Sequence, residues 1–182
     1  MTTLEEITDF LTKANKLVGK SSKDKYASQY DFILKKGHSY IYRKFTNEEN
    51  EVLMDALKHV SQFKPKIKEC YRNSYLLAGI GSKLGFQYCE GFAAGPIPVN
   101  HAWVDYNGLP IDITWRKNDI KSYTAKSLMA IVKNNLVDSS YYGINIPFQY
   151  VEKLFLRKKS FMSVIDNWED GWPLMKKEFQ FI

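Results

Sequence analysis

The chain has 182 residues, 45% of them hydrophobic, and its 26 basic and 20 acidic side chains give a net charge of +6. This length and apolar content predict one domain with a substantial core, and no run of eighteen apolar residues indicates a membrane span. Residues 1–70 and 71–182 each carry 13 basic and 10 acidic side chains. The evenly spread charge favours a solvated surface over a nucleic-acid-binding arm.

The first 64 residues are predicted to form a helical N-terminal cap. Thr3 with Glu6, and Thr46 with Glu49, are capping boxes that each precede an amphipathic run. Between them, SSKDKYASQ predicts a mobile connection or a short helix, and HSYIYRKF predicts a strand. The start, MTTLEEITDF, is acidic and amphipathic rather than a signal peptide, and with only two cysteines we expect reduced thiols and a cytoplasmic location.

A helix that carries a cysteine is predicted to follow Pro65. It starts near Glu69 or Cys70, runs through YRNSYLLAGI and ends in a glycine-rich stretch. In the first turn, the helix dipole and the free N–H groups would stabilise a Cys70 thiolate and an oxyanion. A free cysteine is more often a small buried hydrophobe, and that is the interpretation we give to Cys89 in the predicted strand FQYCEGFAA.

The dipeptide Asn107-Gly108 predicts a two-residue hairpin turn that pairs Tyr106 with Leu109. Counting outward pairs Trp103 with Asp112, and His101 with Thr114. Because side chains alternate between faces, this register predicts an apolar core face of Ala102, Val104, Tyr106, Leu109, Ile111, Ile113 and Trp115. The opposite face would carry His101, Trp103, Asp105, Pro110, Asp112 and Thr114.

His101 and Asp112 are diagonal neighbours in this register, within reach of each other. The carboxylate would fix the imidazole for work as a general base, with Trp103 as a shield from water, and we favour this over an ordinary polar sheet face. Cys70, His101 and Asp112 are therefore the predicted nucleophile, base and orienter.

These residues, in the segments KECYRNSYLL, YCEGFA, HAWV and IDITW, resemble the papain-like, transglutaminase-like superfamily over about residues 66–116. The resemblance implies an α+β fold, in which a catalytic helix packs on an antiparallel sheet. The helical patterns on either side of these residues predict N- and C-terminal helical additions to that core. It implies the roles of nucleophile, base and orienter for the same three residues. The spacing also resembles, more distantly, that of arylamine N-acetyltransferases.

Three further side chains are candidates for contact with the substrate. Glu90 either binds an amine or amide or faces solvent, with equal weight given to both interpretations. Asn73 either makes a polar contact near the cysteine or lies on the helix surface. Trp103 either lines the cleft, beside a wall formed by residues 95–100, or belongs to the core.

Residues 65–116 are thus the predicted catalytic core, and residues 117–182 a helical C-terminal part. In that part SYTAKSLMAIVKNNL predicts a helix, followed by a loop and a second helix from about Pro147.

The predicted function is a cysteine hydrolase or acyltransferase. It would hydrolyse an amide, peptide or isopeptide bond in a protein, peptide or small amide substrate, with transfer to an amine as a close second. No metal or organic cofactor is expected, since the two cysteines lack paired spacing and His38 and His59 fit no ligand pattern. The alternative is a catalytically inactive module of the same fold that binds an acidic partner or nucleic acid.

Overall fold

The computed structural model describes residues 4–18, 25–40, 42–95, 97–116, 120 and 122–176. Its helices and strands are, in chain order, α1 (Leu4–Leu17), α2 (Gln29–Lys36), β1 (His38–Ser39), α3 (Asn47–Ser61), α4 (Cys70–Ile80), β2 (Gln87–Ala94), β3 (Pro98–Tyr106), β4 (Leu109–Ile111), α5 (Ala125–Asp138), β5 (Ser140–Ile146) and α6 (Phe148–Lys158). Short 3-10 turns lie between α4 and β2, at Ser82–Leu84, and after α6, at Trp168–Asp170 and Pro173–Met175.

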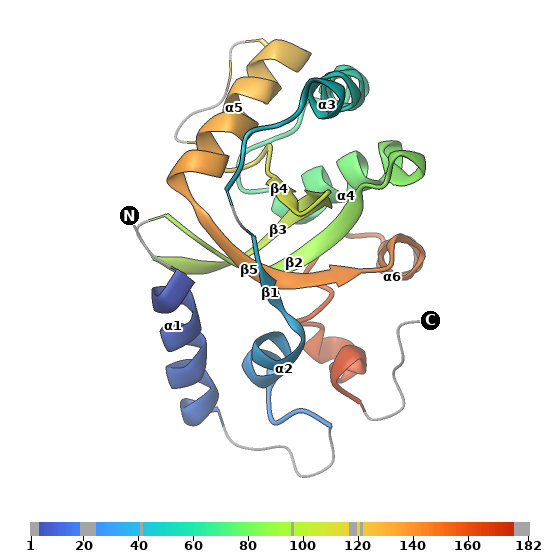
Figure 1. Ribbon diagram of the computed structural model, residues 1–182. Coiled ribbons are helices and arrows are strands. Elements are labelled where there is room, and N and C mark those ends of the chain that lie inside the picture. Colours follow the sequence, from blue (N-terminus) through green and yellow to red (C-terminus); the bar gives the residue numbers. More distant parts are fainter. Residues whose placement is uncertain are drawn as a thin grey trace.

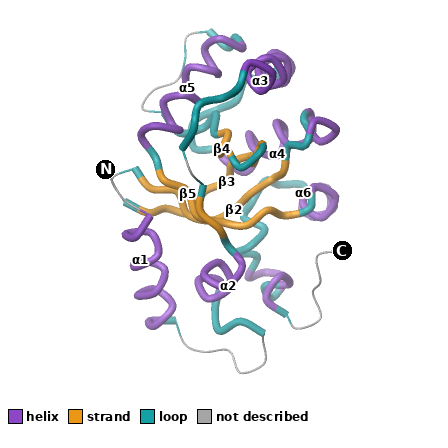
Figure 2. The backbone as a smooth tube through the Cα atoms, in the orientation of Figure 1, coloured by secondary structure: helices purple, strands orange, loops and turns teal. Residues whose placement is uncertain are grey.

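The five strands form one antiparallel sheet in the order β1-β5-β2-β3-β4. Figure 1 shows α1 and α2 below this sheet and α3 and α5 above it, and Figure 2 shows the strands as a single curved layer. Helix α4 packs against β3. The fold is therefore α+β, with a cysteine-bearing helix packed on an antiparallel sheet. No helix in the described part of the chain is long and apolar enough to cross a membrane.

The sheet takes strands from outside the predicted catalytic core. Residues 140–146, predicted as a loop, form β5, which lies between β1 and β2. A Cβ atom at Gly143 would lie 2.5 Å from the indole of Trp103 and 2.4 Å from the carbonyl oxygen of Glu90. Gly143 therefore permits close packing inside the sheet. Residues 65–116 do not build the sheet alone.

The predicted helices are confirmed by α1, α3, α4, α5 and α6, and the capping box of Thr46 and Glu49 is present. Thr3, and with it the first predicted capping box, lies outside the described residues. Helix α2 was not predicted, although the Ser28 hydroxyl caps it by accepting from the backbone N–H of Asp31. The strand predicted over 38–45 is wrong in extent, because its described residues pair as a strand with β5 at His38–Ser39 and add one backbone bond from Tyr40 to Tyr141, at 3.3 Å.

The Asn107-Gly108 hairpin has the predicted register next to its turn. Tyr106 pairs with Leu109, Asp105 with Pro110 and Val104 with Ile111, and both turn residues have positive φ. The ladder then stops, so the predicted pairs that place Asp112 opposite Trp103 and Thr114 opposite His101 are wrong.

The pairing of β3 with β4 ends because the Asp112 side chain offers the backbone N–H groups that follow it another acceptor. Its Oδ1 accepts from the backbone N–H groups of Thr114 at 2.7 Å and Trp115 at 3.3 Å, a turn that competes with strand pairing.

The two faces of the hairpin are both buried. Ala102, Val104, Tyr106, Leu109, Ile111 and Ile113 lie in the main core, as predicted. Trp115 was assigned to that core but packs on the other side of the sheet, against a second cluster of Cys89, Ala93, Trp103 and Tyr141. The face predicted to be polar thus contains its own small apolar core, which surrounds the polar pair of His101 and Asp112.

Candidate active site

Cys70 is the first residue of α4 and is 8% exposed. The backbone turns into the helix through Lys68, whose φ of 63° lies in the left-handed region that non-glycine residues seldom occupy. Glu69, the N-cap, makes no side-chain capping bond. The first-turn amides have no acceptor within the helix, so the thiol lies where N–H groups and the helix dipole favour negative charge.

His101 on β3 and Asp112 just after β4 form a buried pair. The Nε2 atom of His101 lies 2.8 Å from Oδ2 of Asp112, and the two side chains are 8% and 0% exposed. The structure thus brings together the two residues that the sequence placed as neighbours, although Asp112 reaches His101 from a turn rather than from a strand.

Besides the Trp115 N–H, three groups that were not predicted as parts of the site hold Asp112 in place. The Tyr141 hydroxyl donates to Oδ2 at 3.1 Å, and the Thr114 N–H donates to Oδ1 at 2.7 Å. Asn135 on α5 donates its amide to the Asp112 carbonyl oxygen at 2.9 Å. The carboxylate is therefore fixed in orientation before any substrate binds.

Cys70 completes the group, because it acts on the His101 side chain and helps to raise the pKa of that residue. Nε2 of His101 faces Asp112, which leaves Nδ1 as the ring nitrogen for a second partner. Burial alone would lower the pKa of His101, but the charge and hydrogen bond of Asp112, together with Cys70, raise it to about 10. Burial would raise the pKa of Asp112, but His101, Thr114 and Tyr141 lower it below its usual value. At neutral pH the pair is an imidazolium and a carboxylate.

The tryptophan that covers His101 is Trp115, not Trp103 as expected. The rings of Trp115 and His101 are 5.1 Å apart. Trp103 is fully buried and therefore does not line a cleft. Its ring contacts that of Tyr141, with centroids 5.2 Å apart, so Trp103 supports the residue that donates to Asp112.

Asn73 is fully buried, which excludes the helix-surface alternative. Its amide exchanges hydrogen bonds with the backbone of Lys66, at 2.6 and 3.2 Å, and donates to the Thr114 hydroxyl at 3.0 Å. Its polar groups are thus committed to the protein. Asn73 ties α4 to the loop before Cys70 and to the turn after Asp112, and it is a positioning residue.

Glu90 faces neither solvent nor a substrate cleft, because it is only 2% exposed. Its carboxylate accepts from the Val164 N–H at 2.8 Å, the Ile165 N–H at 3.2 Å, the Ser163 hydroxyl at 2.8 Å and the Tyr88 hydroxyl at 2.7 Å. Burial raises its pKa to about 6, against the lowering effect of these donors. Glu90 anchors the segment after α6 to the sheet.

Glu90→Ala is expected to lower the free energy of unfolding by about 2–4 kcal/mol, because it leaves buried N–H groups without an acceptor. Glu90→Gln keeps one acceptor oxygen and is expected to cost less than half as much. Urea denaturation of the two variants and the wild type measures both values. Equal losses for glutamine and alanine would contradict the anchoring role.

Cys89 is a buried structural thiol, in agreement with the sequence interpretation. It is 0% exposed and hydrogen-bonds to Asn145 at 3.0 Å and Tyr40 at 3.3 Å. Burial raises its pKa, so the protein contains its own reference for an unreactive cysteine.

Among the described residues, no three histidine, cysteine, aspartate or glutamate side chains come together as a metal site. What the geometry brings together is a thiol, an imidazole and a carboxylate, linked in series. No family model, curated protein or solved structure matches the chain.

Proposed function

We propose that the protein is a thiol-dependent acyl-transfer enzyme with a papain-like, transglutaminase-like core. The observation that carries the proposal is the series Cys70–His101–Asp112, in which the cysteine opens a helix and the imidazole is fixed by a buried carboxylate. A nucleophile beside a base that is held by an orienter is the arrangement that covalent acyl transfer needs.

The chemistry follows from the protonation of His101. The thiolate attacks the carbonyl carbon of an amide or ester, and the first-turn N–H groups of α4 stabilise the oxyanion. The His101 imidazolium gives its proton to the departing amine or alcohol, which leaves an acyl group on Cys70. Neutral His101 then takes a proton from water or from an acceptor amine, which attacks the thioester and frees Cys70.

The proposed reaction is hydrolysis of an amide, peptide or isopeptide bond. When an amine rather than water attacks the acylated Cys70, the same intermediate gives transfer of the acyl group to that amine. Both cysteines are free and buried, as in proteins of reducing compartments, and the proposal includes a cytoplasmic location.

The test is acylation by 4-nitrophenyl acetate at pH 7. Wild type is expected to release a burst of nitrophenolate and to gain an acetyl group on the peptide that contains Cys70, as seen by mass spectrometry. Cys70→Ala is the control for other nucleophiles, and Cys89→Ala is expected to react like wild type. Acetylation that persists in Cys70→Ala, or no burst in wild type, would overturn the proposal and favour the inactive binding module.

A further inference from the structure

A groove lies between the segment that follows β1 and the C-terminal half of α5. It consists of two pockets of about 350 and 310 Å³, which adjoin because Tyr42, Leu136 and Val137 line both of them. Residues 42–45 and Lys133 line the larger pocket. Figure 1 shows the segment running from β1 to α3 past the end of α5. Each pocket has the size of a typical ligand site, and together they form one elongated groove.

The segment along this groove has unpaired backbone groups. Residues 42–45 belong to neither a helix nor a strand, and Tyr42, Arg43 and Lys44 are exposed. Within the described part of the chain, the four backbone N–H groups of this segment donate to no acceptor. The segment leaves the sheet at β1, which is an edge strand. Unpaired backbone groups at the edge of a sheet are what an added peptide strand binds.

The side chains of the groove favour a negatively charged ligand. Lys44 and Lys133 are exposed and form no ion pair with any described residue. Arg43, in contrast, is held by the Glu49 carboxylate at 2.6 and 2.7 Å. Neither pocket has an aspartate or a glutamate among its lining residues. Charge complementarity therefore points to an acidic ligand.

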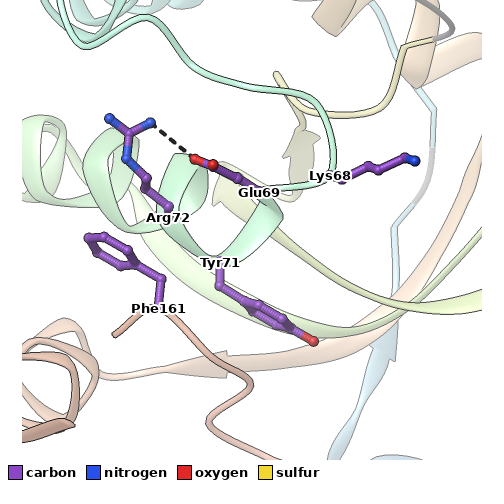
Figure 3. Close-up of a pocket in the computed structure, with 5 residues that line it drawn as sticks. All are labelled: Lys68, Glu69, Tyr71, Arg72 and Phe161. Carbon is purple, nitrogen blue, oxygen red and sulfur yellow. Dashed lines mark ion pairs between the residues drawn. The ribbon is translucent and has the colours of Figure 1, made fainter. Parts of the chain in front are cut away.

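The pocket at the start of α4 differs from the groove in its charges. It is lined by Lys68, Glu69, Tyr71, Arg72 and Phe161 (Figure 3). Its Glu69 carboxylate lies 3.5 Å from Nη1 of Arg72, so an acid of the protein already pairs with the guanidinium there. The two lysines of the groove have no such partner among the described residues.

The groove also presents apolar surface next to its lysines. Tyr42 is 54% exposed and Val137 is 49% exposed, whereas Leu136 beside them is buried. All three line both pockets, so the exposed apolar surface is continuous along the groove. An extended ligand that carries both apolar and acidic side chains matches this lining.

We propose that this groove binds an acidic peptide segment of another protein in an extended conformation. The peptide backbone pairs with residues 42–45, its apolar side chains contact Tyr42 and Val137, and its carboxylates lie near Lys44 and Lys133. A peptide is favoured over single-stranded nucleic acid, because unpaired backbone N–H groups suit peptide carbonyls and aliphatic side chains give bases no ring on which to stack.

The binding site is independent of the acyl-transfer chemistry. Neither Cys70 nor His101 is among the residues that line the two pockets. Cys70→Ala, which removes the nucleophile, is therefore expected to bind the peptide like wild type. Failure of the proposed function and failure of the groove are separate results.

The test is fluorescence anisotropy with a fluorescein-labelled hexapeptide of two glutamates, two valines and two glutamates. When extended, this probe presents a glutamate, a valine and a glutamate on each face. The matched neutral probe has glutamine in place of every glutamate. Wild type is expected to bind the acidic probe at least about fivefold more tightly, as two exposed ion pairs allow. Raising the NaCl concentration from about 0.05 to about 0.3 M is expected to shrink the difference.

Pairing through the backbone is tested by methylating the backbone nitrogens of both valines in the acidic probe. Alternate N–H groups of a strand point to opposite edges, so one of the two faces residues 42–45 in either orientation. The methylated probe is expected to bind at least about fivefold more weakly than its parent.

The role of the lysines is tested by a double variant, Lys44→Met with Lys133→Met. It is expected to bind the acidic probe about fivefold more weakly and the neutral probe within about twofold of wild type, which also shows that it is folded. Lys58→Met with Lys126→Met is the matched control, because it removes the same charge from exposed positions of α3 and α5 outside the groove. It is expected to change neither affinity.

Three results would overturn the proposal. The first is equal affinity for the acidic and the neutral probe. The second is an equal loss of affinity in the control double variant. The third is tighter binding of a fluorescein-labelled oligouridylate than of the acidic probe, which would assign the groove to nucleic acid.

Discussion

Asp112→Ala is expected to lower the free energy of unfolding by about 3–5 kcal/mol, the cost of removing one partner from a buried ion pair. The substitution leaves the His101 charge uncompensated and leaves the Tyr141 hydroxyl and the Thr114 N–H without their acceptor. Urea denaturation at pH 7 measures the loss.

Tyr141→Phe is the matched control for this substitution. It removes one hydrogen bond to the same carboxylate and keeps the ring against Trp103, so about 1 kcal/mol is expected. If Asp112→Ala lowers the free energy of unfolding no more than Tyr141→Phe does, His101 and Asp112 are not a charged pair.

The same pair sets how stability depends on pH. Because the folded-state pKa of His101 is raised from 6.5 to about 10, its contribution is fully present below about pH 6.5 and is lost as pH rises toward 10. The pKa of Asp112 is lowered, so its contribution is present above its unfolded value of about 3.9 and is lost on acidification. The free energy of unfolding is therefore expected to change less steeply with pH in Asp112→Ala, in both the alkaline and the acidic range.

His101→Gln is expected to slow acylation of Cys70 by 4-nitrophenyl acetate by about 10²–10⁴-fold, the usual contribution of a positioned acid or base. Cys70 loses its imidazolium partner, and the leaving group loses its proton donor. The burst of nitrophenolate, followed at pH 7, gives the rate.

His59→Gln is the control, because His59 is exposed on α3 and pairs only weakly with Asp55 at 3.8 Å. A rate within threefold of wild type is expected for it. The same small effect in His101→Gln would remove His101 from the mechanism.

Local signals predicted the parts of the site that depend on neighbours in the sequence. Pro65 and the apolar spacing placed the start of α4 at Cys70, and Asn107-Gly108 fixed the turn that brings His101 near Asp112. Turn chemistry and helix periodicity act over a few residues, so both could be predicted from the sequence.

The parts that depend on distant partners could not be predicted. Asn73 bonds to Thr114, 41 positions away, and Glu90 bonds to Val164, 74 positions away. Both side chains are polar, and their sequence neighbours do not show that they are buried. The β5 strand was missed for a related reason, since Gly143 is explained by the Glu90 backbone and the Trp103 ring that lie against it, both distant in sequence.

The most direct test of the account is the pH dependence of alkylation of Cys70 by iodoacetamide, read by mass spectrometry with Cys89 as the internal reference. The account predicts that Cys70 reacts at pH 6 at least about tenfold faster than Cys89, because Cys70 lies at the start of α4 beside His101 whereas Cys89 is fully buried. It also predicts that His101→Gln abolishes this excess and that Cys89 stays unreactive. A Cys70 that reacts as slowly as Cys89, and whose rate is indifferent to His101→Gln, would contradict it.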